Sequence, residues 1–307
     1  MGILTMIGIF GANGFIGRHL VARLAAGPER VRAVSRHFDP VFAATLPPEV
    51  EVVQADLADD IAMASALADL RVVVQLVSTS SPGLQNRYAV SDIRDNVLPQ
   101  VSFLEACVAA KVERYVFLSS GGTVYGQPQT LPIPETHPAR PLSSHGMTKL
   151  VVEQYVDMYG RLHGLPYVVL RVANPFGPGQ TFRKGQGLIP ALLQRHAQGL
   201  PVRIINGGEA IRDFLYIDDL TDAVAASIAS PAAAMRTINV GSGEGRRIMD
   251  VIEAVEAVLG QRFAREDGGR RDSDVDANVL DITLARDLLG WSPRTSFLEG
   301  LRRTLRG

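Results

Sequence analysis

The chain has 307 residues, 46% hydrophobic and 21% charged, a composition typical of a globular protein with a sizeable core. Its net charge of −1, with arginines spread along the chain, argues against nucleic acid as a partner. The single cysteine, Cys107, lies in an apolar pattern and excludes an internal disulfide or a cysteine metal site. No apolar stretch approaches the ~20 residues that span a bilayer, and residues 1–10 lack the basic start of a signal peptide. We therefore expect a cytoplasmic protein with no metal site and no membrane segment.

The first expected element is a buried parallel strand at residues 7–10, which runs into a glycine-rich turn. Gly11 permits a tight turn, Gly14 lets the backbone approach a pyrophosphate, and Gly17 lets the next helix, residues 15–26, pack closely on the sheet. The helix N-terminus would offer N–H groups and its positive dipole end to the phosphates. Strand, glycines and helix together predict a dinucleotide site. The cofactor-binding residues expected in this turn are Gly11, Asn13, Gly14, Phe15, Ile16 and Gly17.

Short β-branched runs and helical patterns then alternate along the chain. Strands are expected at 31–35, 51–54, 72–77, 115–119 and 167–171, and helices at 97–111 and 147–163. This alternation predicts an α/β fold of the Rossmann type, a doubly wound parallel sheet with helices on both faces. Loops rich in Gly and Pro indicate a smaller C-terminal α/β region for substrate. We expect a dinucleotide-binding domain at 1–173 and a substrate-binding region at 174–307, with about 212–245 returning to the main domain.

The end of the second strand bears on the choice between NAD and NADP. Ser35, Arg36 and His37 stand there, with no carboxylate before Asp39 to repel a 2′-phosphate. A hydroxyl followed by a guanidinium favours NADP, with NAD still possible, although Arg36 is alternatively a plain surface residue. Asp56 is placed to accept from the adenine amino group, or is a helix N-cap, a role that Asp59 or Asp60 would fill equally well. Leu57, after the third strand, and Leu76, within the expected fourth strand, are further expected cofactor contacts.

Several ordered motifs together resemble the nucleotide-sugar branch of the extended short-chain dehydrogenase/reductase family. That branch includes UDP-glucose 4-epimerase-like enzymes, sugar 4,6-dehydratases, decarboxylases and 4-ketoreductases. The resemblance covers nearly the whole chain. The motifs are G-A-N-G-F-I-G (11–17), A-D-L (55–57), D-N-V (95–97), Y-V-F-L-S-S-G-G-T-V-Y-G (115–126), R-V-A-N-P-F-G-P-G-Q (171–180), R-D-F-L-Y-I-D-D-L (212–220), N-V-G-S-G (239–243) and L-L-G-W-S-P (288–293).

The resemblance implies a role for individual residues. Asn174 would hydrogen-bond the diphosphate of a UDP- or TDP-sugar, and Arg212 and Arg271 would neutralise it, although either arginine is alternatively an exposed ion pair. Lys149 would hold the nicotinamide ribose, and Asn96 would support the sheet and the cofactor site. The resemblance also implies a homodimer through the helices at 97–111 and 147–163.

Two of the three catalytic groups implied by the resemblance are replaced. His145 stands four residues before Lys149, where the family has its tyrosine, and Gly121 stands where it has Ser or Thr. A tyrosine starts from a pKa of ~10 and a histidine from ~6.5. Lys149 nearby favours a neutral imidazole, which can accept a proton from a hydroxyl, whereas an imidazolium can donate one. Ser120 or Thr123 would supply the missing hydroxyl, or water would fill the gap.

Three interpretations of His145 stay open. It is a working acid/base, or the mark of a weak or inactive protein that binds cofactor and sugar nucleotide, or a structural residue while another group such as Tyr125 does the chemistry. We expect a nucleotide-diphosphate-sugar 4-epimerase or 4-ketoreductase with His145 and Lys149 as its catalytic pair. NADP favours the ketoreductase, and Gly121-Gly122 lacks the acidic pair of a dehydratase. A cofactor-dependent protein with no sugar substrate is a further alternative.

Overall fold

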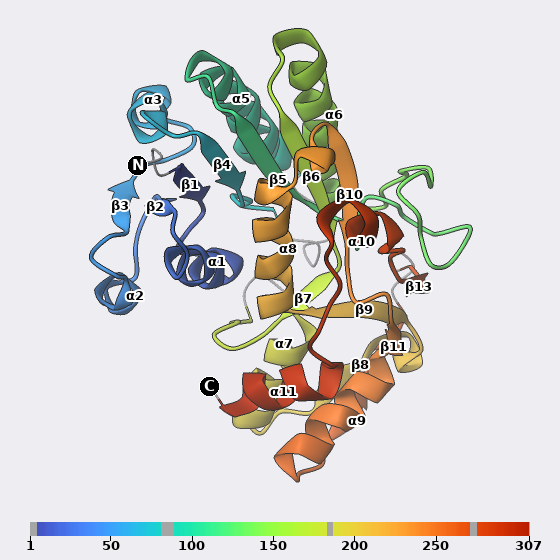
Figure 1. The fold of residues 1–307 in the computed structure, drawn as a ribbon. Coiled ribbons are helices and arrows are strands. Elements are labelled where there is room, and N and C mark those ends of the chain that lie inside the picture. The colour runs from blue at the N-terminus through green and yellow to red at the C-terminus, as the bar shows by residue number, and fades with distance from the viewer. Residues whose placement is uncertain (1–4, 81–88, 183–186, 271–274, 307) are drawn as a thin grey trace.

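The computed structural model describes residues 5–80, 89–182, 187–270 and 275–306. Seven parallel strands form the main sheet in the order β3-β2-β1-β4-β5-β6-β10 (Figure 1). The strand order reverses between β1 and β4, beside the glycine-rich turn, and this confirms the doubly wound α/β fold. The strands are β1 (Met6–Phe10), β2 (Arg30–Ser35), β3 (Glu51–Gln54), β4 (Val72–Gln75), β5 (Arg114–Ser120), β6 (Tyr167–Val172) and β10 (Arg236–Val240).

Helices cover both faces of this sheet. On one face lie α3 (Asp60–Leu67), α5 (Leu98–Ala109) and α6 (Ser144–His163), and on the other lie α1 (Phe15–Ala25), α8 (Ile217–Ala229) and α10 (Thr283–Leu289). Strand side chains alternate between the two cores. In β5, Val116 and Leu118 enter the core on the α1 and α8 side, while Tyr115 and Phe117 enter the opposite one. The strands are therefore apolar on both faces, which explains their continuous β-branched runs.

Local hydrogen bonds account for the places where element bounds differ from expectation. Helix α6 begins at Ser144, three residues before the expected start at 147, because the Ser143 side chain caps it by accepting from the Gly146 N–H. Strand β4 ends at Gln75, whose Oε1 accepts from the Val77 N–H at 2.8 Å and draws the backbone out of the ladder. Before α5 lie the short α4 (Ala89–Asp92) and a π-helical turn, Ile93–Val97. Helix α2 (Pro40–Thr45) follows β2.

The smaller C-terminal region lies beyond the carboxyl ends of the main strands (Figure 1). One of its sheets joins β7 (Asn174–Phe176), β9 (Ile211–Tyr216), β11 (Gly245–Arg247) and β13 (Ala277–Asn278), and β8 (Val202–Ile204) pairs with β12 (Arg265–Asp267). Its helices are α7 (Leu188–Ala197), α9 (Ile248–Leu259) and α11 (Phe297–Arg306), with a 3₁₀ turn at Ile205–Gly208; a second 3₁₀ turn, Pro231–Ala233, joins α8 to β10. Strand β10 pairs with β6, so this late segment lies in the main sheet. The division at residue 173 stays a prediction.

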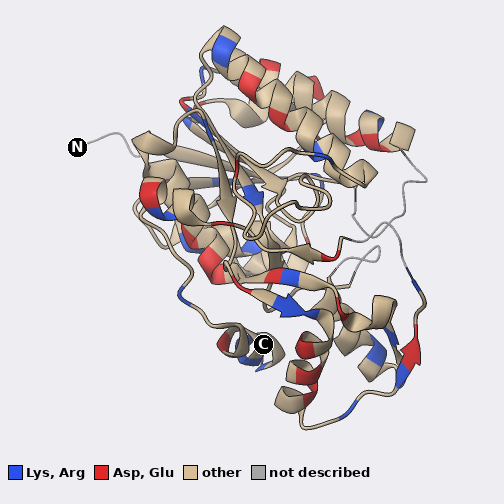
Figure 2. Cartoon of the chain, turned by 90° about the vertical axis from the view of Figure 1, so that its right-hand side faces the viewer, with Lys and Arg blue, Asp and Glu red and all other residues tan. Residues whose placement is uncertain are grey.

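An aromatic cluster and a mixed surface complete the architecture. Phe176, Phe214 and Phe297 pack with ring centroids 5.3–6.4 Å apart and fasten α11 to β7 and β9. Basic and acidic side chains are interspersed along helices and strands (Figure 2), in keeping with the small net charge. Within the described ranges, no helix combines the length and the apolarity that crossing a bilayer requires.

Candidate active site

The glycine-rich turn after β1 forms a cradle that side chains would fill. Gly11 has a φ of +91°, which favours glycine, and a Cβ on Gly17 would lie 2.3 Å from the Gly11 carbonyl oxygen. A Cβ on Gly14 would lie 3.2 Å from the same oxygen. No side chain caps the N-terminus of α1, so its first N–H groups are available to an anion. Phe15 and Ile16, at the start of α1, pack partly on the core.

Asn13 ties this turn to the segment after β2. Its Oδ1 accepts from Arg18 Nη2 at 2.9 Å and from the Asp39 N–H at 3.2 Å. Arg18 also forms an ion pair with Asp39, at 3.1 Å. The carboxylate of Asp39 is thus held by Arg18 on α1, and the hydrogen bonds to Arg18 lower the pKa of Asp39 below its usual value.

The carboxyl ends of β2 and β3 place Arg36 beside Asp56. Their charged groups are 3.9 Å apart and both side chains are exposed, while Ser35 closes β2 and is partly buried. Asp59, not Asp56, is the N-cap of α3, since its Oδ1 accepts from two N–H groups of the first turn. Asp56 Oδ1 accepts from the Ala58 N–H in a local turn. The side chain of Leu57 is buried in the core beneath α3, and Leu76 packs partly on the opposite core.

His145 occupies the first turn of α6 and is buried, with 7% of its surface exposed. Its Nδ1 lies 2.8 Å from Ser80 Oγ, on the segment that follows β4. Burial, helped by the nearby Lys149 charge, lowers the pKa of His145 to about 3. The imidazole is therefore neutral near pH 7, and its protonated form is strongly disfavoured.

Lys149 follows one turn later on the same helix face. Its Nζ donates to the Leu118 carbonyl oxygen at 2.7 Å and lies 4.8 Å from the centre of the Phe117 ring. Burial lowers the pKa of Lys149 to about 8, and the carboxylate of Glu153 partly opposes this shift. Glu153, a further turn along, forms a buried ion pair with Arg171 of β6 at 2.7 Å and accepts from Ser119.

The hydroxyl next to His145 comes from a residue that the sequence analysis missed. A Cβ on Gly121 would lie 2.6 Å from Leu280 Cδ1 and 3.0 Å from the Arg171 carbonyl oxygen, so Leu280 occupies the space where a serine side chain would start. Thr123 Oγ1 is buried without a hydrogen bond. The partner of His145 is Ser80, and the available signal was the hydroxyl-rich run S-T-S-S at 78–81, just beyond a strand's carboxyl end.

Asn96 acts on this segment from the π-helical turn. Its Oδ1 accepts from the N–H groups of Thr79 and Ser80, at 2.7 and 3.3 Å, and its Nδ2 donates to the Asp92 carbonyl oxygen. The amide thus fixes the backbone that presents Ser80 to His145.

Two of the three residues expected to bind substrate lie on the paired strands β7 and β9. Asn174 Nδ2 donates to the Asp213 carbonyl oxygen at 2.8 Å, which places it beside the neighbouring Arg212, a partly buried residue. Asn174 Oδ1 and Ser120 Oγ would lie 3.8 and 4.0 Å from a Cβ on Gly122, so the end of β5 faces Asn174. Arg271 lies outside the described residues.

Tyr125 is a scaffold residue in this structure. It is fully buried, its hydroxyl donates to Asn239 Oδ1 at 2.6 Å, and its ring packs against the guanidinium of Arg171. Burial raises the pKa of Tyr125 to about 12. A phenol so enclosed is poorly placed to exchange a proton with a substrate.

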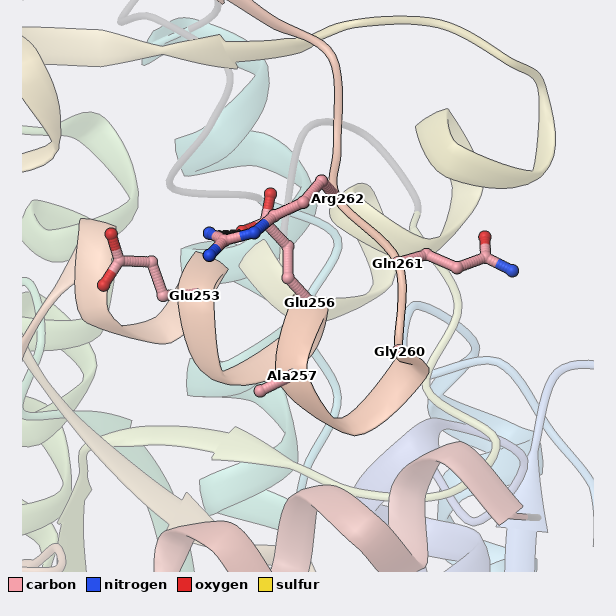
Figure 3. Close-up of a pocket in the computed structure, with 6 residues that line it drawn as sticks. All are labelled: Glu253, Glu256, Ala257, Gly260, Gln261 and Arg262. Atoms are coloured by element: carbon pink, nitrogen blue, oxygen red, sulfur yellow. Dashed lines mark hydrogen bonds and ion pairs between the residues drawn. The ribbon is translucent and has the colours of Figure 1, made fainter.

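A surface pocket of about 360 Å³ lies elsewhere, at the end of α9 (Figure 3). Arg262 reaches over it and forms an ion pair with Glu256 at 3.0 Å, while Glu253 and Gln261 point to opposite sides. None of the candidate site residues is among those that line it, and α9 belongs to the smaller region in Figure 1. The residues expected to carry the chemistry lie instead on α6 and at the ends of the main-sheet strands.

Residues 7–241 match the model of the NAD dependent epimerase/dehydratase family. The chain belongs to this family. A curated relative is the UDP-glucose 4-epimerase of Mycolicibacterium smegmatis, 30% identical over 303 residues, or 97% of this chain and 96% of the relative. Two solved structures each have a TM-score of 0.90 and cover 98% of both chains: Thermotoga maritima UDP-glucose 4-epimerase with UDP-glucose, 28% identical, and Thermus thermophilus UDP-glucose 4-epimerase with NAD, 29% identical.

Family membership establishes the general class. The chain is a member of an NAD-dependent family of nucleotide-sugar epimerases, dehydratases and reductases. Its glycine-rich turn, β1 and α1 lie inside the matched range, as do His145 and Lys149.

Proposed function

We propose that this protein is a nucleotide-diphosphate-sugar 4-epimerase or 4-ketoreductase that uses His145 and Lys149 as its catalytic pair. The observation that carries the proposal is the placement of both side chains on one face of α6. Lys149 reaches the end of β5 at Leu118. A UDP- or TDP-sugar would lie with its diphosphate at Asn174, Arg212 and Arg271.

The residues of the turn fit a nicotinamide dinucleotide. The cradle at Gly11, Gly14 and Gly17 and the open start of α1 suit a pyrophosphate, and Lys149 would hold the nicotinamide ribose. When bound, the cofactor supplies the hydride acceptor or donor. Arg36 and Ser35 favour NADP, because β2 itself ends without a carboxylate, and Arg36 would have to exchange its exposed contact with Asp56, at 3.9 Å, for the 2′-phosphate.

The choice of cofactor bears on the choice of reaction. A ketoreductase consumes external NADPH, whereas an epimerase returns the hydride to the sugar and usually keeps NAD. NADP would therefore favour the 4-ketoreductase. The similarity to UDP-glucose 4-epimerases supports the epimerase instead.

A second candidate is a protein that binds cofactor and sugar nucleotide but turns over weakly or not at all. Two features support it: burial lowers the pKa of His145 to about 3, which disfavours an imidazolium, and Leu280 occupies the space where a side chain at position 121 would start.

A direct experiment separates the two candidates. Calorimetric titration with NADPH and NADH comes first, followed by assays on UDP-, TDP- and GDP-sugars and their 4-keto forms. We expect His145→Phe to lower turnover at least 100-fold with little change in cofactor affinity. His163→Phe, an exposed histidine on the same helix, is the matched control. Binding of both ligands without turnover in the wild-type protein would instead support the binding protein.

We also propose that the protein is a homodimer through α5 and α6. Supporting this, several apolar side chains on and just before these helices have about half or more of their surface accessible, among them Val90, Ile93, Leu98 and Met147. A second copy covering this face would bury them.

A further inference from the structure

The bond between His145 and Ser80 continues outward to a second hydroxyl. Ser80 Oγ lies 2.8 Å from His145 Nδ1 and 3.2 Å from Ser78 Oγ, and in each pair either atom can be the donor. Exposure rises along this row: His145 is buried, Ser80 is partly buried and Ser78 is exposed. The row thus runs from the interior of the candidate site to solvent.

We propose that Ser80 and Ser78 form a hydroxyl relay through which the Nδ1 atom of His145 exchanges protons with solvent, leaving Nε2 to face the substrate oxygen. This inference rests on the proposed function for the role of Nε2. The relay itself is a property of the protein without ligands.

The chemistry explains why a buried imidazole needs such a partner. Reduction of a ketone adds a hydride to carbon and a proton to oxygen. A neutral imidazole that gives its Nε2 proton to this oxygen must gain a proton at Nδ1 to stay neutral. Ser80 Oγ–H would supply that proton and recover one from Ser78 or water, so the ring changes tautomer and never becomes an imidazolium. Oxidation of an alcohol runs the same steps in reverse.

Because the pKa of His145 is low, exchange between the two neutral tautomers is more favourable than formation of an imidazolium. The backbone also holds Ser80 in place, because Asn96 Oδ1 accepts from the Ser80 and Thr79 N–H groups. The hydroxyl is therefore presented to Nδ1 by a fixed segment.

Nuclear magnetic resonance of the full chain labelled with ¹⁵N-histidine tests the relay without cofactor or substrate. The His145 ring signals, assigned with His145→Asn, report the tautomer and the rate at which the ring N–H exchanges with solvent. We expect Ser80→Ala to shift the Nδ1 signal and to slow exchange at least 10-fold. Ser80→Thr should restore both, because it keeps the hydroxyl. Ser78→Ala should slow exchange less, since water can replace an exposed hydroxyl.

Ser65→Ala, an exposed serine on α3, is the matched control and should change neither signal nor rate. Unchanged His145 signals and exchange in a folded Ser80→Ala protein would overturn the relay. If Ser80→Ala slows exchange at His145 but the wild-type protein turns over no sugar nucleotide, the relay is supported and the proposed function is rejected. The two proposals can therefore fail separately.

Discussion

At position 145 a buried imidazole stands where related enzymes are expected to carry a phenol, and the two groups handle protons differently. Burial and the nearby Lys149 charge favour the neutral ring, so His145 accepts a proton with difficulty and can pass one on only if its other ring nitrogen changes protonation at the same time. Ser80 is the hydroxyl within reach of the ring. Within the candidate site, His145 and Lys149 both have pKa values lowered by burial, which is common at catalytic centres.

The buried imidazole makes stability dependent on pH in a defined window. The pKa of His145 is about 3 in the folded protein and ~6.5 in the unfolded chain, so between these values only the unfolded chain binds the proton. Stability therefore falls as the pH drops below about 6.5. When the pH falls from 7 to 4.5, we expect the free energy of unfolding of His145→Asn to decrease by about 2–3 kcal/mol less than that of the wild-type protein. Urea unfolding measures both. Equal losses in both proteins would contradict the prediction, and His163→Asn is the control.

At the scale of elements, a buried ion pair fixes α6 to the sheet. Glu153 of α6 and Arg171 of β6 are joined by three hydrogen bonds, and both side chains are almost fully buried. The pair sets the rotation of the helix, and with it the direction in which Lys149 and His145 point. Ser119 donates to the same carboxylate, which ties β5 to this arrangement.

Removing one charge from this pair tests how much the pair contributes to the free energy of unfolding. Glu153→Gln leaves the guanidinium of Arg171 buried without a counter-charge, and we expect a loss of about 3–5 kcal/mol in the free energy of unfolding. Glu113→Gln breaks the exposed ion pair with Arg71 and should lose less than about 1 kcal/mol. Chemical denaturation of both variants measures the difference. Similar losses would mean that the buried pair does not fix α6.

At the scale of the whole molecule, the exposed apolar side chains of α4, α5 and the π-helical turn between them form the surface on which a second copy is proposed to dock. Leu98 has 59% of its surface exposed, and Ile93 has 52%. We expect Leu98→Glu to convert a dimer into a monomer, because the partner would have to bury a charge. Light scattering after gel filtration gives the mass directly. Val41→Glu, on α2, is the control and should leave the dimer intact. A wild-type protein that is monomeric in solution would contradict the proposed dimer.

The sequence by itself determined the fold class, the glycine-rich turn and the four-residue spacing of His145 and Lys149, although the helix expected at 147–163 did not include His145, which the Ser143 N-cap brings into α6. These features depend on local rules: hydrophobic periodicity, turn chemistry and helical spacing act between residues close in the chain. The sequence nevertheless left open which aspartate caps α3. The structure shows that it is Asp59.

Only the tertiary structure decided which side chains meet. Ser80 reaches His145 across 65 positions, and Leu280 fills the space beside Gly121. From the sequence, Ser120 or Thr123 is expected to supply the hydroxyl that Gly121 lacks, and this stays a prediction. The contact between Ser80 and His145 depends on how β4 and β5 lie side by side and on the loops that leave them. Such pairings follow from the order of strands in the sheet and from core packing, which no local pattern encodes.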